Sequence, residues 1–194
     1  NGSVKYTGLV VDGEPVRDAS CAVTGAVDGL RAASDVEVSA DGLHVYVTGE
    51  LDDAVAVFDR QAVTGDLSFK QFLRDGVAGV NGLGNVRGAA LSPDGKHLYT
   101  AAKSDNGVGI FARSAATGQL TYLGIRVDGS PQPPRSLDGL AGASAVAVSP
   151  DGAHVYVAGE TDDAVAVFSR NATSGLLTFV EARKDGLGGV DGLN

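Results

Sequence analysis

The stretch DGLHVYVTGELDDAVAVFDR, at residues Asp41–Arg60, returns almost unchanged as DGAHVYVAGETDDAVAVFSR at Asp151–Arg170. A more diverged copy, DGKHLYTAAKSDNGVGIFAR, lies between them at Asp94–Arg113. The first residues of the copies are 53 positions apart (41 to 94) and then 57 positions apart (94 to 151). A repeat of this length is typical of solenoids, propellers and other arrays, so the repeat decides the fold before any single residue does.

Each repeat contains four short apolar segments separated by turns of Gly, Asp and Ser. In the first repeat we expect them at Asp35–Ser39, His44–Thr48, Ala54–Asp59 and Leu67–Leu73. Their lengths and their content of Val, Phe and Tyr predict strands, and no helical periodicity of useful length is present. Turns such as Ser149-Pro-Asp-Gly152 would join the first two strands, because Pro presets φ and Asp-Gly completes a tight turn. The predicted fold class is all-β.

Both faces of these strands are apolar. In the second segment of the first repeat Val45 and Val47 lie on one face and Tyr46 lies on the other. A sheet of this kind must be covered on both sides. Four antiparallel strands per repeat, covered on both faces, predict the blades of a β-propeller. A two-layer sandwich is the alternative, but it does not account for so regular a repeat.

The repeat also predicts how the chain is divided. The expected parts are the final strand of a preceding blade at 4–12, blades at 31–75, 86–128 and 142–185, and a C-terminal connector at 186–194. That is three full units plus one extra N-terminal strand. Propellers usually close with about 4 to 8 blades. The expected partners are therefore further blades, either from a longer chain or from homo-oligomeric copies.

Composition excludes some classes of partner. The chain has 24 acidic and 15 basic residues, for a net charge of −9, which argues against nucleic acid. No apolar run approaches the roughly 20 residues needed to cross a membrane. Cys21 is the only cysteine, so no internal disulfide can form, and we interpret it as an inert side chain in a connector. Asn171 lies in an Asn-Ala-Thr glycosylation pattern, and the acidic, tandem-repeat character favours an extracellular or cell-surface location.

Two long segments of the repeats carry a resemblance to a known family. They are VSPDGAHVYVAGETDDAVAVFSRNATSGLLTF at 148–179 and LSPDGKHLYTAAKSDNGVGIFARSAATGQLTY at 91–122. They resemble the lactonase-type β-propellers, which include proteins with the YVTN motif. The resemblance implies a seven-bladed ring, of which this chain would supply about half. Lactonases place His and Arg residues just before the SPDG strand and in the central funnel, and here Arg87 is the polar candidate.

Two sets of side chains recur at one position per repeat. His44, His97 and His154 could hold a metal only if they lined the axis, so a solvated or hydrogen-bonded role is favoured. The second set follows the third strand of each repeat and consists of Arg60, Arg113 and Arg170. For these arginines we expect a stem packed on the blade and a head in water.

Carboxylates are expected to gather on one side of the array. The turns between the second and third strands and the connectors after the fourth strand share that side, and they carry Glu50, Asp52, Asp53, Asp105, Glu160, Asp162, Asp163 and Asp12, Asp28, Asp75, Asp128, Asp138, Asp185, Asp191. Calcium suits such ligands. However, no loop has the spacing of an EF-hand, and Asp-Gly is a common turn. Structural turns without a cofactor are favoured, with calcium as the alternative.

The connectors differ in length, and insertions in repeat proteins often gather on the binding face. Asp12 to Asp28 spans 16 positions and Asp128 to Asp138 spans 10. We therefore expect a partner, such as a protein or glycan, at Gly13–Ala26 and Gly129–Ser136.

Two functional hypotheses follow. The favoured one is a non-catalytic binding or structural module that presents its connectors to a protein, glycan or cation, with no catalytic residue of its own. The alternative is a lactonase-like hydrolase whose active site is completed by further blades or by a second copy. The first is favoured because function must be argued from a site, and no catalytic His is visible.

Overall fold

The computed structural model describes residues 11–13, 15–17, 23–133 and 135–189. Within these ranges the chain forms strands and turns and contains no helix, hence none that could cross a membrane. Most of the predicted strand at 4–12 lies outside the described residues, as do Cys21 and the end of the predicted C-terminal connector. The predicted all-β class is confirmed.

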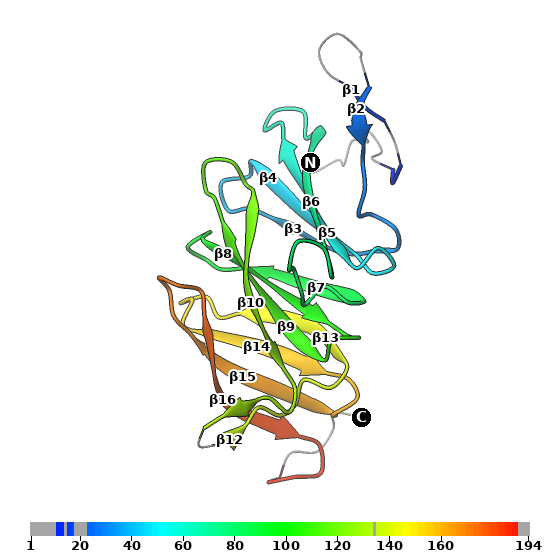
Figure 1. Cartoon of the computed structure of the whole chain (residues 1–194). Helices are drawn as coiled ribbons and strands as arrows, with labels where there is room; N and C mark the ends of the chain where they lie inside the picture. The colour runs from blue at the N-terminus through cyan, green and yellow to red at the C-terminus, as the bar shows by residue number, and fades with distance from the viewer. Residues whose placement is uncertain (1–10, 14, 18–22, 134, 190–194) are drawn as a thin grey trace, which may run out of the picture.

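Three four-stranded sheets account for most of the described chain (Figure 1). Each is an antiparallel meander whose strands pair in chain order. The first sheet contains β3 (Ala33–Val38), β4 (His44–Gly49), β5 (Ala54–Arg60) and β6 (Leu67–Arg74). The second contains β7 (Val86–Leu91), β8 (His97–Ala102), β9 (Gly107–Arg113) and β10 (Leu120–Val127). The third contains β13 (Ala143–Val148), β14 (His154–Gly159), β15 (Ala164–Arg170) and β16 (Leu177–Lys184). These are the blades of a partial β-propeller.

The two longest connectors each contain a small antiparallel hairpin. β1 (Pro15–Arg17) pairs with β2 (Val23–Ala26) before the first sheet. β11 (Pro131–Gln132) pairs with β12 (Arg135–Ser136) between the second and third sheets. The sequence analysis identified both connectors as long insertions but did not predict these strands, which are too short to show an alternating pattern.

The alternation of side chains across β4 and β5 is the predicted one. Tyr46 pairs with Val57, and the two side chains lie in a core cluster between the first and second sheets. Val45 pairs with Phe58 on the opposite face, where both belong to a separate apolar cluster. The first sheet is therefore apolar on both faces, as a blade between two neighbours must be.

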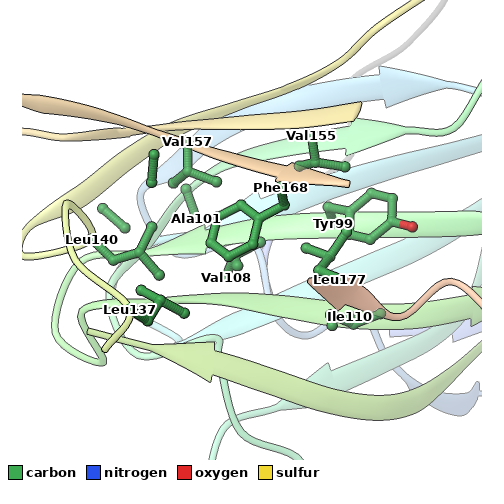
Figure 2. Packing of buried hydrophobic residues seen from close by; sticks show 12 residues of the cluster. Tyr99, Ala101, Val108, Ile110, Leu137, Leu140, Val155, Val157, Phe168 and Leu177 are labelled. Atoms are coloured by element: carbon green, nitrogen blue, oxygen red, sulfur yellow. The ribbon is translucent and has the colours of Figure 1, made fainter. Parts of the chain in front are cut away.

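The second and third sheets enclose the largest core cluster (Figure 2). Phe168 lies in its middle and is fully buried. Leu137 and Leu140, which belong to the connector between the two sheets, close one end of the cluster. The other fully buried members are Tyr99, Ala101, Val108, Ile110, Ala143, Val155, Val157, Ala166 and Leu177. Burial of this apolar surface is the main force that holds neighbouring blades together.

The first strands of the three sheets lie next to one another and form the inner edge of the array. Ser34 Oγ in β3 donates to the Val86 carbonyl in β7 at 3.0 Å, and the Ala89 amide in β7 donates to Asp35 Oδ2 at 2.8 Å. On the other side of β7, Gly88 packs so closely on the backbone of Ala145 in β13 that a Cβ at Gly88 would lie 3.2 Å from its Cα. In a propeller these innermost strands surround the central axis.

A buried polar network joins the second sheet to the first, and it overturns the expectation that the recurring arginines extend into water. Arg113 is only 8 % exposed. Its Nε donates to Tyr46 Oη at 2.6 Å, its Nη1 to the Gly95 carbonyl at 2.9 Å and its Nη2 to Asp41 Oδ2 at 3.1 Å. The guanidinium group reaches a partner one repeat away, which the pattern of a single repeat does not reveal.

The same network recurs between the third and second sheets. Arg170 Nε donates to Tyr99 Oη at 2.9 Å, and Nη2 donates to both carboxylate oxygens of Asp94 at 2.9 Å. Tyr99 Oη donates in turn to the Gly175 carbonyl of the third sheet at 2.9 Å. A charged group buried in this way is stabilised only while its partners remain in place.

The histidines take part in these networks. His44 and His97 are each 4 % exposed, and their Nδ1 atoms lie 2.9 Å from Arg113 Nη2 and 2.8 Å from Arg170 Nη2. Because a guanidinium group can only donate, Nδ1 accepts and each ring is a neutral tautomer protonated at Nε2. The hydrogen-bonded role favoured from the sequence is confirmed for these two residues.

Acid is expected to destabilise the fold in two stages. Burial and the nearby Arg170 lower the pKa of His97 below 6.5, so stability is lost as the pH falls through 6.5 and the unfolded chain takes up the proton. Burial alone would raise the pKa of Asp94, but hydrogen bonds from Ser92 and Arg170 lower it to about 2, so a second loss occurs as the pH falls from 3.8 towards 2.

Urea midpoints between pH 8 and pH 2 check this expectation. Replacement of both buried histidines, His44→Gln and His97→Gln, should flatten the decline between pH 6.5 and pH 5 and leave the later decline in place. An unchanged first stage in this double variant would contradict the assignment.

Candidate functional site

Arg87 lies at the inner edge, where all three sheets meet. It is the second residue of β7, and its side chain extends between the ends of β4 and β14. Its Nη2 lies 3.1 Å from Glu50 Oε1, directly after β4. Its Nη1 lies 3.4 Å from Glu160 Oε2, directly after β14. One side chain of the second sheet thus joins the first and third sheets near the axis.

Two further polar side chains complete this group. Lys103 Nζ lies 2.8 Å from Glu160 Oε2, and Asn85 Nδ2 donates to Glu50 Oε1 at 3.1 Å. We call Glu50, Asn85, Arg87, Lys103 and Glu160 the axial cluster. The hydrogen bond from Lys103 lowers the pKa of Glu160 below 4.5, and the charge of Arg87 adds to the effect. Glu160 is therefore a carboxylate at neutral pH.

Arg87 retains capacity for a ligand. Its side chain is 35 % exposed, and its Nε is buried without a hydrogen-bond partner among the residues that the structure describes. The exposed part of this guanidinium group can donate to a carboxylate, a phosphate or a developing oxyanion, all of which accept hydrogen bonds. The axial cluster can thus bind an oxygen-rich ligand and stabilise negative charge on it.

The sequence indicated only part of this cluster. Arg87 was the polar candidate, whereas Glu50 and Glu160 were assigned to acidic turns and Lys103 was not considered. A signal was present in the repeats, because the residue after the second strand is Glu50, then Lys103, then Glu160. The middle repeat reverses the charge at that position, and the structure places the opposite charges together.

The acidic turns on the same side mainly hold the backbone. Asp105 Oδ2 accepts from the amides of Gly82 and Gly84 at 3.0 and 2.9 Å, and Asp162 Oδ2 accepts from Ala141 at 3.0 Å. These bonds join the turns between the second and third strands to the connectors. The two sets of loops therefore lie on the same side of the array, as the sequence predicts. Asp and Asn also suit the left-handed backbone found at Asp53, Asn106 and Asp163. The favoured interpretation of structural turns agrees with these contacts.

Two groups of three carboxylates have geometry compatible with a metal ion. Their oxygen atoms lie within 4.8 Å of one another in Asp12, Asp28, Asp52 and in Asp128, Asp138, Asp162. Each group is in contact with a basic side chain. Arg74 Nη2 lies 3.3 Å from both Asp28 and Asp52, and Lys184 Nζ lies 2.7 Å from Asp138 and 3.1 Å from Asp162. These cations supply the positive charge that calcium would bring.

The other sequence candidates lie away from the axis. Asn171 is exposed in the turn before β16, and its Oδ1 accepts from the amides of Thr173 and Ser174 at 2.9 and 3.0 Å. The predicted partner connector at Gly129–Ser136 forms the hairpin β11–β12, which is anchored by the Gly129 amide on the Leu137 carbonyl at 2.9 Å. The other predicted connector, Gly13–Ala26, lies partly outside the described residues.

Comparison with known proteins finds a matching family and several similar solved structures. Residues 13–133 and 126–186 match the family described as lactonase, 7-bladed β-propeller. The chain is 27 % identical to a putative 6-phosphogluconolactonase from Bacteroides fragilis, with a TM-score of 0.64, over 86 % of this chain and 42 % of that one. It is 29 % identical to a periplasmic gluconolactonase from Pseudomonas aeruginosa, with a TM-score of 0.63, over 87 % of this chain and 44 % of that one.

A curated relative agrees with these structures. A probable 6-phosphogluconolactonase from Arthroderma benhamiae is 30 % identical over an alignment of 101 residues that covers 48 % of this chain and 24 % of that protein. The chain thus spans about a quarter of its curated relative and less than half of each of the two solved relatives.

Proposed function

Because the chain belongs to the lactonase family of seven-bladed β-propellers, we propose that it forms part of a hydrolase that opens the ring of a sugar lactone. Relatives named as 6-phosphogluconolactonase and gluconolactonase support this substrate class. The observation that carries the proposal is Arg87, which is partly exposed at the inner edge and lies between Glu50 and Glu160. The relatives favour this hydrolase over the non-catalytic module that the sequence alone favoured.

The reaction requires a group that stabilises negative charge on the lactone carbonyl. The oxygen of a water molecule forms a bond to the carbonyl carbon, and the carbonyl oxygen becomes an oxyanion. The ring C–O bond then breaks, a proton passes to the ring oxygen and a hydroxy acid results. Arg87 is assigned to the oxyanion, because donors already in place cost little reorganisation when the charge develops.

The water must also lose a proton to a base. Glu160 is held by Lys103 at 2.8 Å, which lowers its pKa and makes it a weak base. Glu50 contacts Arg87 and Asn85 only through Oε1, and its side chain is 27 % exposed. We therefore assign Glu50 as the base that this chain contributes, within reach of the same guanidinium group. The remaining blades of the ring would supply the other substrate contacts.

Replacement of Arg87 by alanine is expected to lower kcat/KM for lactone hydrolysis by about a hundredfold, the loss typical of one oxyanion donor. The conservative Arg87→Lys variant should recover part of the loss. The measurement is proton release from glucono-δ-lactone and its 6-phosphate in a pH-stat, with the spontaneous rate subtracted. Arg183→Ala is the matched control, since the Arg183 side chain is 57 % exposed and its ion pair joins Glu181, outside the axial cluster. These variants are measured in the complete ring that contains this chain, and a complete ring without saturable hydrolysis would overturn the proposal.

A further inference from the structure

The connector between the first and second sheets contains the pair Asn81-Gly82, where the other two connectors have Asp28-Gly29 and Asp138-Gly139. An asparagine before glycine is especially prone to lose its side-chain amide, because glycine has no Cβ to keep its nitrogen away from the asparagine side chain. Among the described residues the chain has one other such pair, Asn106-Gly107, at the start of β9. The sequence does not separate these two pairs, but their contacts do.

The Gly82 nitrogen lies against the side chain that it would attack. Gly82 donates to Asn81 Oδ1 at 2.8 Å, so the side-chain carbonyl carbon, one bond away from that oxygen, is close to the same nitrogen. Asn81 is exposed, so water can reach the reacting group and ammonia can leave. The folded chain therefore already holds the two reacting atoms together, which favours cyclisation.

A carboxylate is available to take the proton from this nitrogen. Asp105 Oδ2 accepts from the Gly82 amide at 3.0 Å, and Asp105 forms no ion pair with a described residue. The amide must lose its proton as it attacks, and a carboxylate within hydrogen-bond distance can accept that proton. Asp105 thus supplies the general base that cyclisation at Asn81 requires.

The side chain of Asn106, in contrast, is held away from its own following nitrogen. Asn106 is exposed as well, so exposure alone does not distinguish the two pairs. Its Oδ1 accepts from the Gly142 amide, in the connector to the third sheet, at 2.8 Å. Gly107 is the first residue of β9 and pairs with Ala102 of β8. Cyclisation at Asn106 would break the contact with Gly142 and distort the start of a strand.

We propose that Asn81 is a site of spontaneous deamidation that the fold assists. The Gly82 nitrogen forms a bond to the Asn81 side-chain carbonyl carbon, and its proton passes to Asp105. The bond from that carbon to the side-chain nitrogen then breaks, and the departing nitrogen takes up the proton and leaves as ammonia. Water opens the resulting succinimide at either of its two carbonyl carbons, which gives aspartate or isoaspartate at position 81. The proposal does not depend on the lactonase activity.

The product would lack the basic partner that the other sheets provide. In the first sheet Arg74 Nη2 lies 3.3 Å from Asp28, and in the third sheet Lys184 Nζ lies 2.7 Å from Asp138. The second sheet has Val127 at the position of these two bases. Asparagine thus keeps this connector neutral where no cation is present, and deamidation removes that match.

A new carboxylate at position 81 would also face existing ones. Asp105 Oδ2 and Asn81 Oδ1 accept from the same Gly82 amide. Burial, followed by the charges of Asp105 and Asp53, raises the pKa of Asp75 in the same connector. A further negative charge adds repulsion to this group. Deamidation is therefore expected to weaken the junction between the first and second sheets.

Peptide mapping of the complete ring that contains this chain, after incubation in mildly alkaline buffer, tests the proposal. Trypsin separates the two pairs, with Asn81 in Asp75–Arg87 and Asn106 in Ser104–Arg113. In the folded protein Asn81 should deamidate about tenfold faster than Asn106 or more, because only its attacking nitrogen is in place. In urea both pairs lose their fixed contacts, and the two rates should become alike. Digestion in water enriched in ¹⁸O marks any deamidation that occurs during the digest.

Two variants test the contribution of the carboxylate. Asp105→Asn keeps an oxygen that can accept from the Gly82 amide but removes the base, so the rate at Asn81 should fall about tenfold. Asp162→Asn is the matched control, because Asp162 accepts from the Ala141 amide at the same position of the third sheet. The Asn106 peptide is the internal check on folding, since its rate should stay low in a folded variant and rise in an unfolded one.

Asn81→Asp reproduces one product and should lower the urea midpoint at neutral pH, whereas the neutral Asn81→Gln should leave the midpoint nearly unchanged. A folded protein in which Asn81 deamidates no faster than Asn106 overturns the proposal. An unchanged rate at Asn81 in folded Asp105→Asn overturns the assignment of Asp105 as the base.

Discussion

Replacement of Arg170 by alanine is expected to lower the free energy of unfolding by about 3–5 kcal/mol, the range for removal of one partner from a buried charged pair. The side chain donates to Tyr99, Asp94 and the Gly152 carbonyl, and it contacts His97 Nδ1 at 2.8 Å. Its loss leaves the His97 acceptor buried without a donor, and it opens space between the second and third sheets. Each of these changes destabilises the folded chain.

The chain contains its own control for this variant. Arg60 stands at the same position of the first repeat, but its side chain makes one hydrogen bond to described residues and the residue is only half-buried. Arg60→Ala should therefore cost less than about 1 kcal/mol in a dilute sample, as for a partly solvated group. Urea unfolding followed by circular dichroism measures both variants. Equal losses in the two would show that the contacts of Arg170 do not stabilise the fold.

Replacement of Phe168 by alanine is expected to lower the free energy of unfolding by about 3–5 kcal/mol, as for large-to-small changes in well-packed cores. Phe168 is fully buried in the cluster of Figure 2, and its ring meets that of Phe179 edge to face at a centroid distance of 5.8 Å. The change removes apolar contacts from both the second and third sheets at once. The surrounding strands are fixed by hydrogen bonds, so they can fill little of the resulting cavity.

Phe72→Ala is the matched control for this variant. Phe72 lies in β6 and is 37 % exposed, so its removal creates no closed cavity and should cost about 1 kcal/mol or less. Thermal unfolding gives the comparison. A Phe168→Ala loss as small as that of Phe72→Ala would mean that the second and third sheets are not held by this core.

The architecture was predictable because its determinants are local. The alternation at Val45, Tyr46 and Val47 fixes which face each side chain takes, and the Asp-Gly turns fix where the chain reverses. Three near-copies of one pattern then predict three near-copies of one sheet. The resemblance to lactonase-type propellers, read from the same segments, is confirmed by the family match.

The role of the arginines was not predictable, because it depends on contacts between repeats. Arg113 meets Tyr46 from 67 positions away, and Arg170 meets Tyr99 from 71 positions away. A repeat read alone shows an exposed strand end at this position. Only the packing of neighbouring sheets turns this position into a buried contact. Arg60 in the first sheet, which has no preceding sheet among the described residues, is only half-buried.

Apart from Arg87, the axial cluster was missed for a related reason. Its members directly follow β4, β8 and β14 or lie at the start of β7, and only the arrangement of the sheets around the axis brings them together. The departures from the repeat were the useful signal. Lys103 replaces a glutamate, and Arg87 stands where the other repeats have Ser34 and Ser144. Positions at which one repeat differs from the others are those where a repetitive fold can carry functional residues.

The network of Tyr, Asp, His and Arg has a direction. Each sheet presents its Tyr, Asp and His towards the next sheet and its Arg towards the previous one. A gene segment that encodes one repeat therefore carries both connections. Its duplication inserts a new blade whose Arg meets the Tyr, Asp and His of the preceding blade. The Tyr, Asp and His of the new blade meet the Arg of the following blade, so no compensating substitution is needed. The near-identity of Asp41–Arg60 and Asp151–Arg170 is the trace expected of such growth. A propeller of this kind can gain or lose whole blades more readily than it can tolerate a change in one buried arginine.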